Sequence, residues 1–190
     1  MVEVCIRTLR REELPEIWKI DRAELVERVY YLEDGELALR DERYDMPGWP
    51  EGEPEHYHPS PVDCYERGGT FLGAFDGQDR LVGAVVLESR FIGTRRDRLQ
   101  LKFLHVGRTH RGRGLGTRLF SMAADAARDL GARWLYVSAT PSENTVGFYL
   151  QRGCTLAREI DPELLELESE DIHLERPLLP SAGGSERRTA

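Results

Sequence analysis

A run of three alternating glycines most constrains the fold of this chain. The stretch VGRTHRGRGLGTRLF, residues 106–120, places Gly112, Gly114 and Gly116 among arginines, directly after the apolar run LQLKFLHV. The residues that follow have helical periodicity, with Gly131 placed to end the helix and one apolar face made of Leu119, Ala123, Ala126 or Ala127, and Leu130. A turn that leaves a strand and opens a helix exposes unpaired N–H groups at the positive end of the helix dipole, and glycines let an anion approach them. The sequence therefore predicts a strand, turn and helix that bind phosphate or pyrophosphate.

Two common phosphate-binding patterns do not fit this turn. A P-loop requires Gly-Lys followed by Ser or Thr, and the dinucleotide fingerprint requires GxGxxG after a first parallel strand. Here the spacing is GxGxG, with Thr117 at the third position after Gly114. The strand before the turn also ends a predicted antiparallel meander, which disfavours a Rossmann fold. An ordinary tight turn remains as the alternative without a ligand.

The surrounding segments predict a mixed sheet. TFLGAF, LVGAVVLESRF and LQLKFLHV are β-rich runs with short connections, which is typical of three consecutive antiparallel strands. RWLYVSA then predicts a buried strand, SENTVGFYLQR a short helix that begins at Ser142 or Asn144 and stops at Gly153, and DIHLERPL a last strand. We expect one α/β (α+β) domain over residues 1–178, its mostly antiparallel sheet flanked by helices, and a flexible tail over 180–190.

The N-terminal part predicts a strand, a helix and a long loop. VEVCIRTL alternates as a strand does, and REELPEIWKIDRAELVERVYYL, residues 11–32, carries apolar residues at helical intervals. Residues 33–69 are rich in acidic, aromatic and proline residues and show little periodicity. This composition predicts a long, partly ordered loop.

Charge and cysteine usage exclude several classes of protein. The formal net charge of −8 argues against a nucleic-acid binder, because phosphate-dominated binding requires a basic field. Cys5, Cys64 and Cys154 lack CxxC spacing, so neither a disulfide framework nor a zinc ribbon is indicated. His56 and His58 with Cys64 do not make a closed tetrahedral set, and no metal is predicted. Without an apolar leader or a run of eighteen apolar residues, we expect a soluble cytoplasmic protein that does not enter the membrane.

The glycine turn also contains Arg-x-x-Gly-x-Gly, formed by Arg111, Gly114 and Gly116, which resembles the acyl-CoA loop of the GNAT (GCN5-related) N-acetyltransferase family. LHV at 104–106 is similar to the family's fourth strand, ARWLYVSATP to its fifth, and ENTVGFYLQRGC to its second conserved block, in which Tyr149 is matched and Cys154 stands in place of an aromatic. The resemblance implies direct transfer of an acetyl group from acetyl-CoA to an amine within a ternary complex. The donor contacts that it implies are Leu104, His105, Val106, Arg111, Gly112, Arg113, Gly114, Leu115, Gly116, Thr117, Asn144 and Tyr149.

Acetyl transfer from a thioester requires a neutral amine, a stabilised oxyanion and a proton for the departing thiolate. The resemblance implies that backbone N–H groups near Val106 meet the thioester carbonyl and that Tyr149 is the acid, although Tyr149 also fits as a packed aromatic beside Phe148. The base stays open between Glu88, His105 and a chain of water molecules. Gln100 also falls near the expected cleft, but an amide cannot act as a base.

The resemblance implies that the loop over residues 33–69 covers the acceptor. Tyr44 and Trp49 offer faces for a cation, and the loop carries Glu36, Asp41, Glu42, Asp45, Glu51, Glu53 and Glu55. We therefore expect a small cationic amine as the acceptor, unless these charges form only a solvated surface. A protein or peptide N-acetyltransferase and a non-catalytic acyl-CoA-binding module are the alternatives, and a homodimer is left open.

Overall fold

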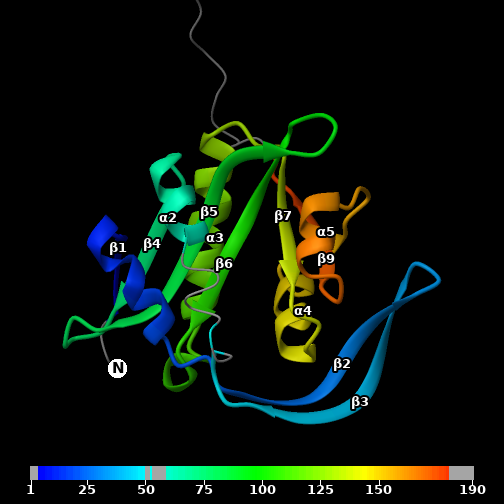
Figure 1. The fold of residues 1–190 in the computed structure, drawn as a ribbon, viewed down its shortest axis with the longest axis horizontal. Helices are drawn as coiled ribbons and strands as arrows, with labels where there is room; N and C mark the ends of the chain where they lie inside the picture. Colours follow the sequence, from blue (N-terminus) through cyan, green and yellow to red (C-terminus); the bar gives the residue numbers. More distant parts are fainter. Residues whose placement is uncertain (1–3, 50–51, 53–58, 180–190) are drawn as a thin grey trace, which may run out of the picture.

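A seven-stranded sheet forms the centre of the fold (Figure 1). In the computed structural model, which describes residues 4–49, 52 and 59–179, the strand order is β1-β4-β5-β6-β7-β9-β8. Neighbouring strands are antiparallel except β6 and β7, which run parallel. The strands are β1 Cys5–Thr8, β4 Thr70–Phe75, β5 Leu81–Ile92, β6 Arg98–Val106, β7 Trp134–Ala139, β8 Thr155–Leu156 and β9 Ile172–Pro177. The predicted meander and the mostly antiparallel sheet are confirmed.

Helices pack on both faces of the sheet, because the central strands are apolar on both sides. In β5, Val85 and Leu87 join the core under helix α3, whereas Ala84 and Val86 join a second core on the opposite face. Alternate residues of a strand point to opposite faces, so one strand serves both layers. The helices are the 3₁₀ helix η1 Arg11–Lys19, α2 Pro59–Glu66, the short η2 Arg108–His110, α3 Leu115–Asp129, α4 Glu143–Leu150 and α5 Pro162–Leu167.

Helix α3 follows the glycine turn, as the sequence predicts. Leu119, Ala123 and Ala127 are fully buried along its inner face. Leu130, which the same pattern assigns to that face, is 49% exposed, so this assignment is wrong. The helix ends at Asp129, and Gly131, with a φ of +91°, reverses the chain while the Ala132 N–H bonds back to the Ala127 carbonyl at 2.9 Å.

The N-terminal prediction is wrong after Lys19. Instead of a helix to residue 32 and a loop, the chain forms a hairpin of β2 Glu24–Glu33 and β3 Glu36–Met46, joined by Asp34 and Gly35 with positive φ angles of 51° and 83°. A β-bulge between Val26 and Arg28 explains the false helical spacing, because it brings residues three apart, Val26 and Val29, into the core. Further along, α2 also lies within the segment predicted as loop. Residues 50, 51 and 53–58 of that segment and the predicted tail over 180–190 lie outside the described residues.

The β2–β3 hairpin is a separate two-stranded sheet that passes beside α4 (Figure 1). The Tyr30 N–H donates to the Pro141 carbonyl at 2.8 Å, and Arg28 forms a two-pronged ion pair with Glu143 at the start of α4. The hairpin therefore places the first residues of β2 and the end of β3 beside a gap, where strands β6 and β7 separate from each other.

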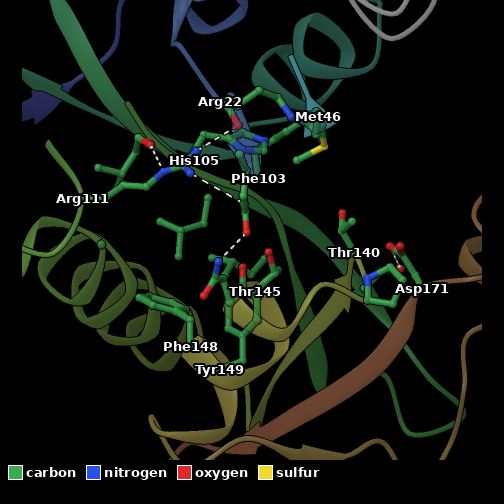
Figure 2. A pocket seen from close by; sticks show the side chains of 18 of the residues that line it. Arg22, Met46, Phe103, His105, Arg111, Thr140, Thr145, Phe148, Tyr149 and Asp171 are labelled. Atoms are coloured by element: carbon green, nitrogen blue, oxygen red, sulfur yellow. Dashed lines mark hydrogen bonds and ion pairs between the residues drawn. The ribbon is translucent and has the colours of Figure 1, made fainter. Parts of the chain in front are cut away.

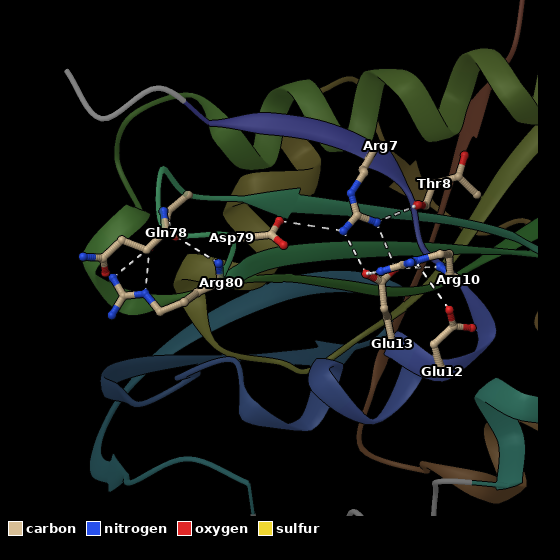
Figure 3. Close-up of polar contacts among 9 residues, drawn as sticks. Arg7, Thr8, Arg10, Glu12, Glu13, Gln78, Asp79 and Arg80 are labelled. Atoms are coloured by element: carbon tan, nitrogen blue, oxygen red, sulfur yellow. Dashed lines mark hydrogen bonds and ion pairs between the residues drawn. The ribbon is translucent and has the colours of Figure 1, made fainter.

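Polar clusters fix the edge of the sheet where β1, η1 and the β4–β5 turn meet (Figure 3). Glu13 accepts two bonds of 2.8 Å from Arg7 and a third from the Arg10 N–H. In the β4–β5 turn, Asp76 is buried and accepts from the Gln78 and Arg80 N–H groups and from the Arg80 guanidinium. These bonds to Arg80 and Gln78 lower the pKa of Asp76 from 3.8 to about 2.

We expect Asp76→Asn to lower the melting temperature at pH 7 by roughly 2–4 °C, because the turn loses its ion pair. The Asp76 carboxylate has a depressed pKa of about 2, so its stabilisation is present above pH 4 and is lost as the pH falls toward 2. The difference between the two proteins should therefore disappear over that range in calorimetric scans. Asp79→Asn is the control, because its carboxylate in the same turn is 83% exposed. A difference that stays constant down to pH 2 would contradict the assignment.

Candidate active site

Strands β6 and β7 separate and leave a cleft between them. They pair only where Arg98–Gln100 face Trp134–Tyr136, while β6 continues to Val106 paired to β5 alone. A cavity of about 1220 Å³ occupies this opening and reaches the glycine turn, α4 and the end of β3. Beyond Gln100, the edge of β6 that faces the opening has no partner in β7. Apart from the Val106 carbonyl, which accepts from Arg111, the backbone groups of this edge are therefore open to a ligand in the cleft.

The glycine turn forms one wall of the cleft. Gly112 and Gly114 have φ angles of +72° and +80°, and a Cβ at either position would meet no atom within 4 Å. Gly114 is the N-cap of α3 and no side chain caps that helix end, so its first N–H groups face open space. At Gly116 a Cβ would lie 3.1 Å from the Phe148 ring, so glycine there lets α4 pack closely against α3. The turn has the geometry of an anion site at a helix N-terminus.

Arg111 ties this turn to the residues before β2. Its guanidinium donates to the carbonyls of Val106 at 3.0 Å, Ala23 at 3.3 Å and Arg22 at 3.0 Å, and lies 3.6 Å from Glu24 (Figure 2). Three carbonyl acceptors occupy the fork of the side chain. Arg111 lines the cleft, and its contacts in this structure brace the wall of the site.

Tyr149 enters the cleft from α4. This helix begins at Ser142, whose hydroxyl accepts from the Thr145 N–H, as the capping prediction allows. The Tyr149 ring packs against Phe120 and Phe148, and its hydroxyl makes no hydrogen bond to any residue in the described part of the chain. Burial raises the pKa of Tyr149 well above its ordinary value, so the phenol keeps its proton at neutral pH. The side chain is thus a packed aromatic whose hydroxyl bonds to none of the described residues.

His105 lies in the same cleft but is poorly suited to act as a base. Its ring stacks edgewise on Trp49 at 4.8 Å and lies 5.7 Å from the Phe103 ring. Burial, together with the positive charges of Arg22 and Arg111, lowers the pKa of His105 to about 3. The imidazole is therefore neutral at pH 7 and holds a proton only weakly.

Glu88, the other candidate base, does not face the cleft. It lies in a second cavity of about 490 Å³ that Gln100 also lines, and it accepts from Arg67 at 2.7 Å and from the Ser89 N–H. Burial raises the pKa of Glu88, but these bonds outweigh the effect and the net pKa is lowered. Of the predicted donor contacts, Arg113 is exposed outside the cleft and Leu115 is buried in the core; the cleft is lined by Leu104, His105, Val106, Arg111, Gly112, Gly114, Gly116, Thr117, Asn144 and Tyr149.

Carboxylates that the sequence interpretation did not single out also line the cleft. They are Glu24 at the start of β2 and, on the loop between α5 and β9, Glu168, Glu170 and Asp171. Asp171 accepts from the Ser138 hydroxyl at 2.8 Å, and burial, followed by the charge and hydrogen bond of Glu168, raises the pKa of Asp171 to about 7. The acidic run ELESED at 166–171 was the available signal.

The aromatic residues of the predicted acceptor loop partly match their expected place. Tyr44, Met46 and Trp49 line the cleft, but the Arg22 guanidinium already covers one Trp49 ring at 4.6 Å. The exposed carboxylates of β3 do not line the cleft: Glu36, Asp41, Glu42 and Asp45. Glu51, Glu53, Glu55, His56 and His58 lie outside the described residues.

Neither a membrane-spanning helix nor a metal site is found in the part of the chain that the structure describes. No helix there has both the length and the apolar character needed to span a membrane. Within the same residues, no group of three or more His, Cys, Asp or Glu side chains is arranged to hold a metal ion.

Comparison with known proteins agrees with this architecture. A nourseothricin acetyltransferase is similar in fold at 20% identity, over 93% of this chain and 99% of that chain, with a TM-score of 0.68. A putative streptothricin acetyltransferase from Bacillus anthracis str. Ames, in complex with acetyl coenzyme A, is similar at 18% identity over 92% and 98%, with a TM-score of 0.67. The PaiA N-acetyltransferase from Thermoplasma acidophilum, in complex with coenzyme A, is similar at 18% identity over 93% and 99%, with a TM-score of 0.59.

Family membership rests on the sequence itself. No curated protein sequence matches this chain. The model of the acetyltransferase (GNAT) family matches residues 27–154, which include the glycine turn, the separated strands and α4. The chain belongs to the GNAT family of acetyltransferases.

Proposed function

We propose that this acetyltransferase moves the acetyl group of acetyl-CoA to the amine of a small cationic acceptor. The observation that carries the proposal is the set of carboxylates in the cleft lining, namely Glu24, which lies beside Arg111, and Glu168, Glu170 and Asp171 on the loop between α5 and β9. One cleft thus has both an anion-binding turn and acidic lining residues. A negatively charged donor and a positively charged acceptor would both find complementary groups there.

The donor side supplies the groups that thioester chemistry needs. The pyrophosphate of acetyl-CoA would lie on the open N–H groups of Gly114 and the first turn of α3. The unpaired edge of β6 near Val106 would donate to the thioester oxygen as it becomes an oxyanion. The Tyr149 hydroxyl would protonate the departing thiolate, because it has no other described partner.

The acceptor side favours a cation of limited size. Tyr44 and Met46 from the β2–β3 hairpin and Leu167 from the end of α5 narrow that part of the cleft. Burial raises the pKa of Tyr44, and the negative charges of Glu42, Glu24 and Glu170 raise it further. A cationic amine gains from the same field, which would raise its local concentration at the entrance. Two proteins of similar fold are named for the acetylation of nourseothricin and streptothricin, so these compounds belong among the acceptors to be tested.

A thiol-release screen with acetyl-CoA tests the proposal. Polyamines, aminoglycosides, streptothricin, single amino acids and basic peptides are compared at low and high salt. We expect turnover with small polycationic amines and a rise of KM with ionic strength, because salt screens charges at the entrance. Turnover of neutral or anionic acceptors alone, or a KM that does not depend on salt, would contradict the proposal.

We expect Glu170→Gln to raise KM for a cationic acceptor about two- to fivefold at low salt, the range typical of one exposed charge. The effect on kcat should be smaller than the effect on KM, because Glu170 is exposed at the rim of the cleft. Steady-state kinetics at two ionic strengths measures both effects. Glu166→Gln, on α5 and not in the cleft lining, is the matched control and should leave KM unchanged. Equal effects of the two variants would show that only the overall charge matters.

A further inference from the structure

We propose that Asp171, held by Ser138 and flanked by Glu168, is the general base that takes the proton from the ammonium group of the acceptor. Asp171 lies on the loop between α5 and β9, beyond the residues that the family model matches. The inference rests on the proposed function, because it requires an amine in this cleft. It assigns the base, which neither the glycine turn nor Tyr149 supplies.

The position of Asp171 fits this role. Its Oδ2 atom accepts from the Ser138 hydroxyl at 2.8 Å, and Ser138 belongs to β7, the strand that borders the opening. Figure 2 places Asp171 beside Thr140, across the hollow from His105 and Arg111. Both Asp171 and Tyr149 line the cleft, and the charge of Asp171 contributes to the raised pKa of Tyr149. A base on the acceptor side and an acid on the donor side would thus flank the reacting carbonyl.

Burial and the two carboxylates on its own loop keep the proton affinity of Asp171 high, whereas the basic residues of the cleft lining act against it: Arg22, Lys102, Arg111 and Arg152. Glu168 and Glu170 are on its own loop, and the acidic and phenolic groups of other elements around the cleft are Glu24 from β2, Tyr44 from β3 and Tyr149 from α4. Lys102 from β6 is also in the lining. Burial and Glu168 raise the pKa of Asp171 to about 7, whereas the Ser138 bond opposes the rise. A base works best when its pKa lies near the working pH, which is the condition met here.

The other candidate bases fit less well. The His105 imidazole has a pKa of about 3 and would not retain a proton taken from an ammonium. Glu88 is in the second cavity, bonded to Arg67. The Glu24 carboxylate accepts from Asn144 at 2.7 Å and lies 3.6 Å from the Arg111 guanidinium, so a cation is already paired with it. Asp171 is a half-buried carboxyl of the cleft that bonds to the neutral Ser138 hydroxyl and forms no ion pair with a described residue.

The proposed step conserves atoms and charge. The acceptor R–NH₃⁺ gives one proton to the Asp171 carboxylate, and the nitrogen lone pair then forms the N–C bond to the thioester carbon. The C–S bond breaks with its electron pair on sulfur, which takes a proton from Tyr149. The second nitrogen proton restores the phenol through solvent, and Asp171 releases its proton to water after the amide leaves. The sum is one amine ammonium and acetyl-CoA giving the amide, CoA-SH and one proton.

The pH dependence of kcat/KM for wild type and Asp171→Asn tests the assignment. The wild type should rise tenfold per pH unit below pH 7 and then level off, because the rate follows ionised Asp171. The variant should be about 100-fold slower at pH 7 and should keep rising toward the pKa of the amine, since it can use only free amine. Its affinity for acetyl-CoA, measured by calorimetry, should match the wild type and shows that it is folded.

Two neighbouring variants should shift the rising part of the pH profile of kcat/KM, the acidic limb, in opposite directions. Glu168→Gln removes the charge that raises the pKa of Asp171, so the limb should shift to lower pH by at least about 0.5 unit. Ser138→Ala removes the donor that stabilises the carboxylate, so the limb should shift to higher pH. A purely structural role of this cluster would change rates without these opposite shifts.

The outcomes separate this inference from the proposed function. If only peptides are acetylated in the acceptor screen, the proposal of a small amine as the acceptor is wrong. The pH profiles of kcat/KM, measured with the best peptide, still test the role of Asp171. An Asp171→Asn profile parallel to that of the wild type overturns the base. If Asp171→Asn raises KM but leaves kcat and its pH dependence unchanged, the assignment of Asp171 as the base is also wrong. Asp171 would then only attract the cationic acceptor.

Discussion

Gly114→Asp should weaken acetyl-CoA binding by at least about 100-fold while the protein stays folded. The substitution places a carboxylate where the donor phosphates are expected, at the uncapped start of α3. The helix itself should tolerate it, because an added Cβ meets no atom within 4 Å and Asp is among the residues that accept a positive φ. Titration calorimetry with acetyl-CoA measures the loss, and circular dichroism checks the fold.

Two further variants separate charge from backbone strain. Gly114→Asn brings the same strain without the charge, so its loss of affinity should be clearly smaller than that of Gly114→Asp. Gly131→Asp brings the charge and a comparable strain, with a φ of +91° and open space, at the far end of the same helix. It should bind acetyl-CoA normally. An affinity of Gly114→Asp within threefold of the wild type would show that the donor phosphates do not lie on this turn.

Tyr149→Phe should lower kcat about 100- to 1000-fold with little change in the affinity for acetyl-CoA, because only the proton donor to the thiolate is lost. Since the hydroxyl has no hydrogen-bond partner among the described residues, its removal should not lower the melting temperature. The rate loss should shrink with an acetyl thioester whose thiol is more acidic, because that leaving group needs less protonation. Single-turnover kinetics resolves the chemical step. An unchanged rate with every active acceptor would remove Tyr149 from the mechanism.

The parts of the site that depend only on residues close together in the sequence could be predicted from the sequence. The turn at Gly112–Gly116, the start of α4 at Ser142 and the place of Tyr149 depend on neighbours within one short stretch. Glycine spacing and capping residues report backbone geometry directly, so their patterns transfer from sequence to structure.

The acceptor side could not be predicted in the same way, because it is assembled from distant segments. Glu24 and Asp171 are brought to one cavity by a hairpin whose bulge imitates helical spacing and by a loop after α5. Glu88 lines the second cavity and not the cleft, and the alternation of residues along β5 does not tell which cavity a side chain reaches. The low pKa of His105 arises from burial beneath Trp49, which comes from the segment predicted as a loop.

The most direct test is a competition in one vessel. Acetyl-CoA is offered with equal concentrations of a polyamine, an aminoglycoside, streptothricin, neutral amino acids and a basic peptide, and mass spectrometry follows each acetylated product. The ratio of early products reports the ratio of kcat/KM values. We predict that a small polycationic amine is acetylated first and that the preference narrows at high salt. Preferential acetylation of the peptide or of neutral amino acids, or release of CoA without any acetylated amine, would contradict the proposal.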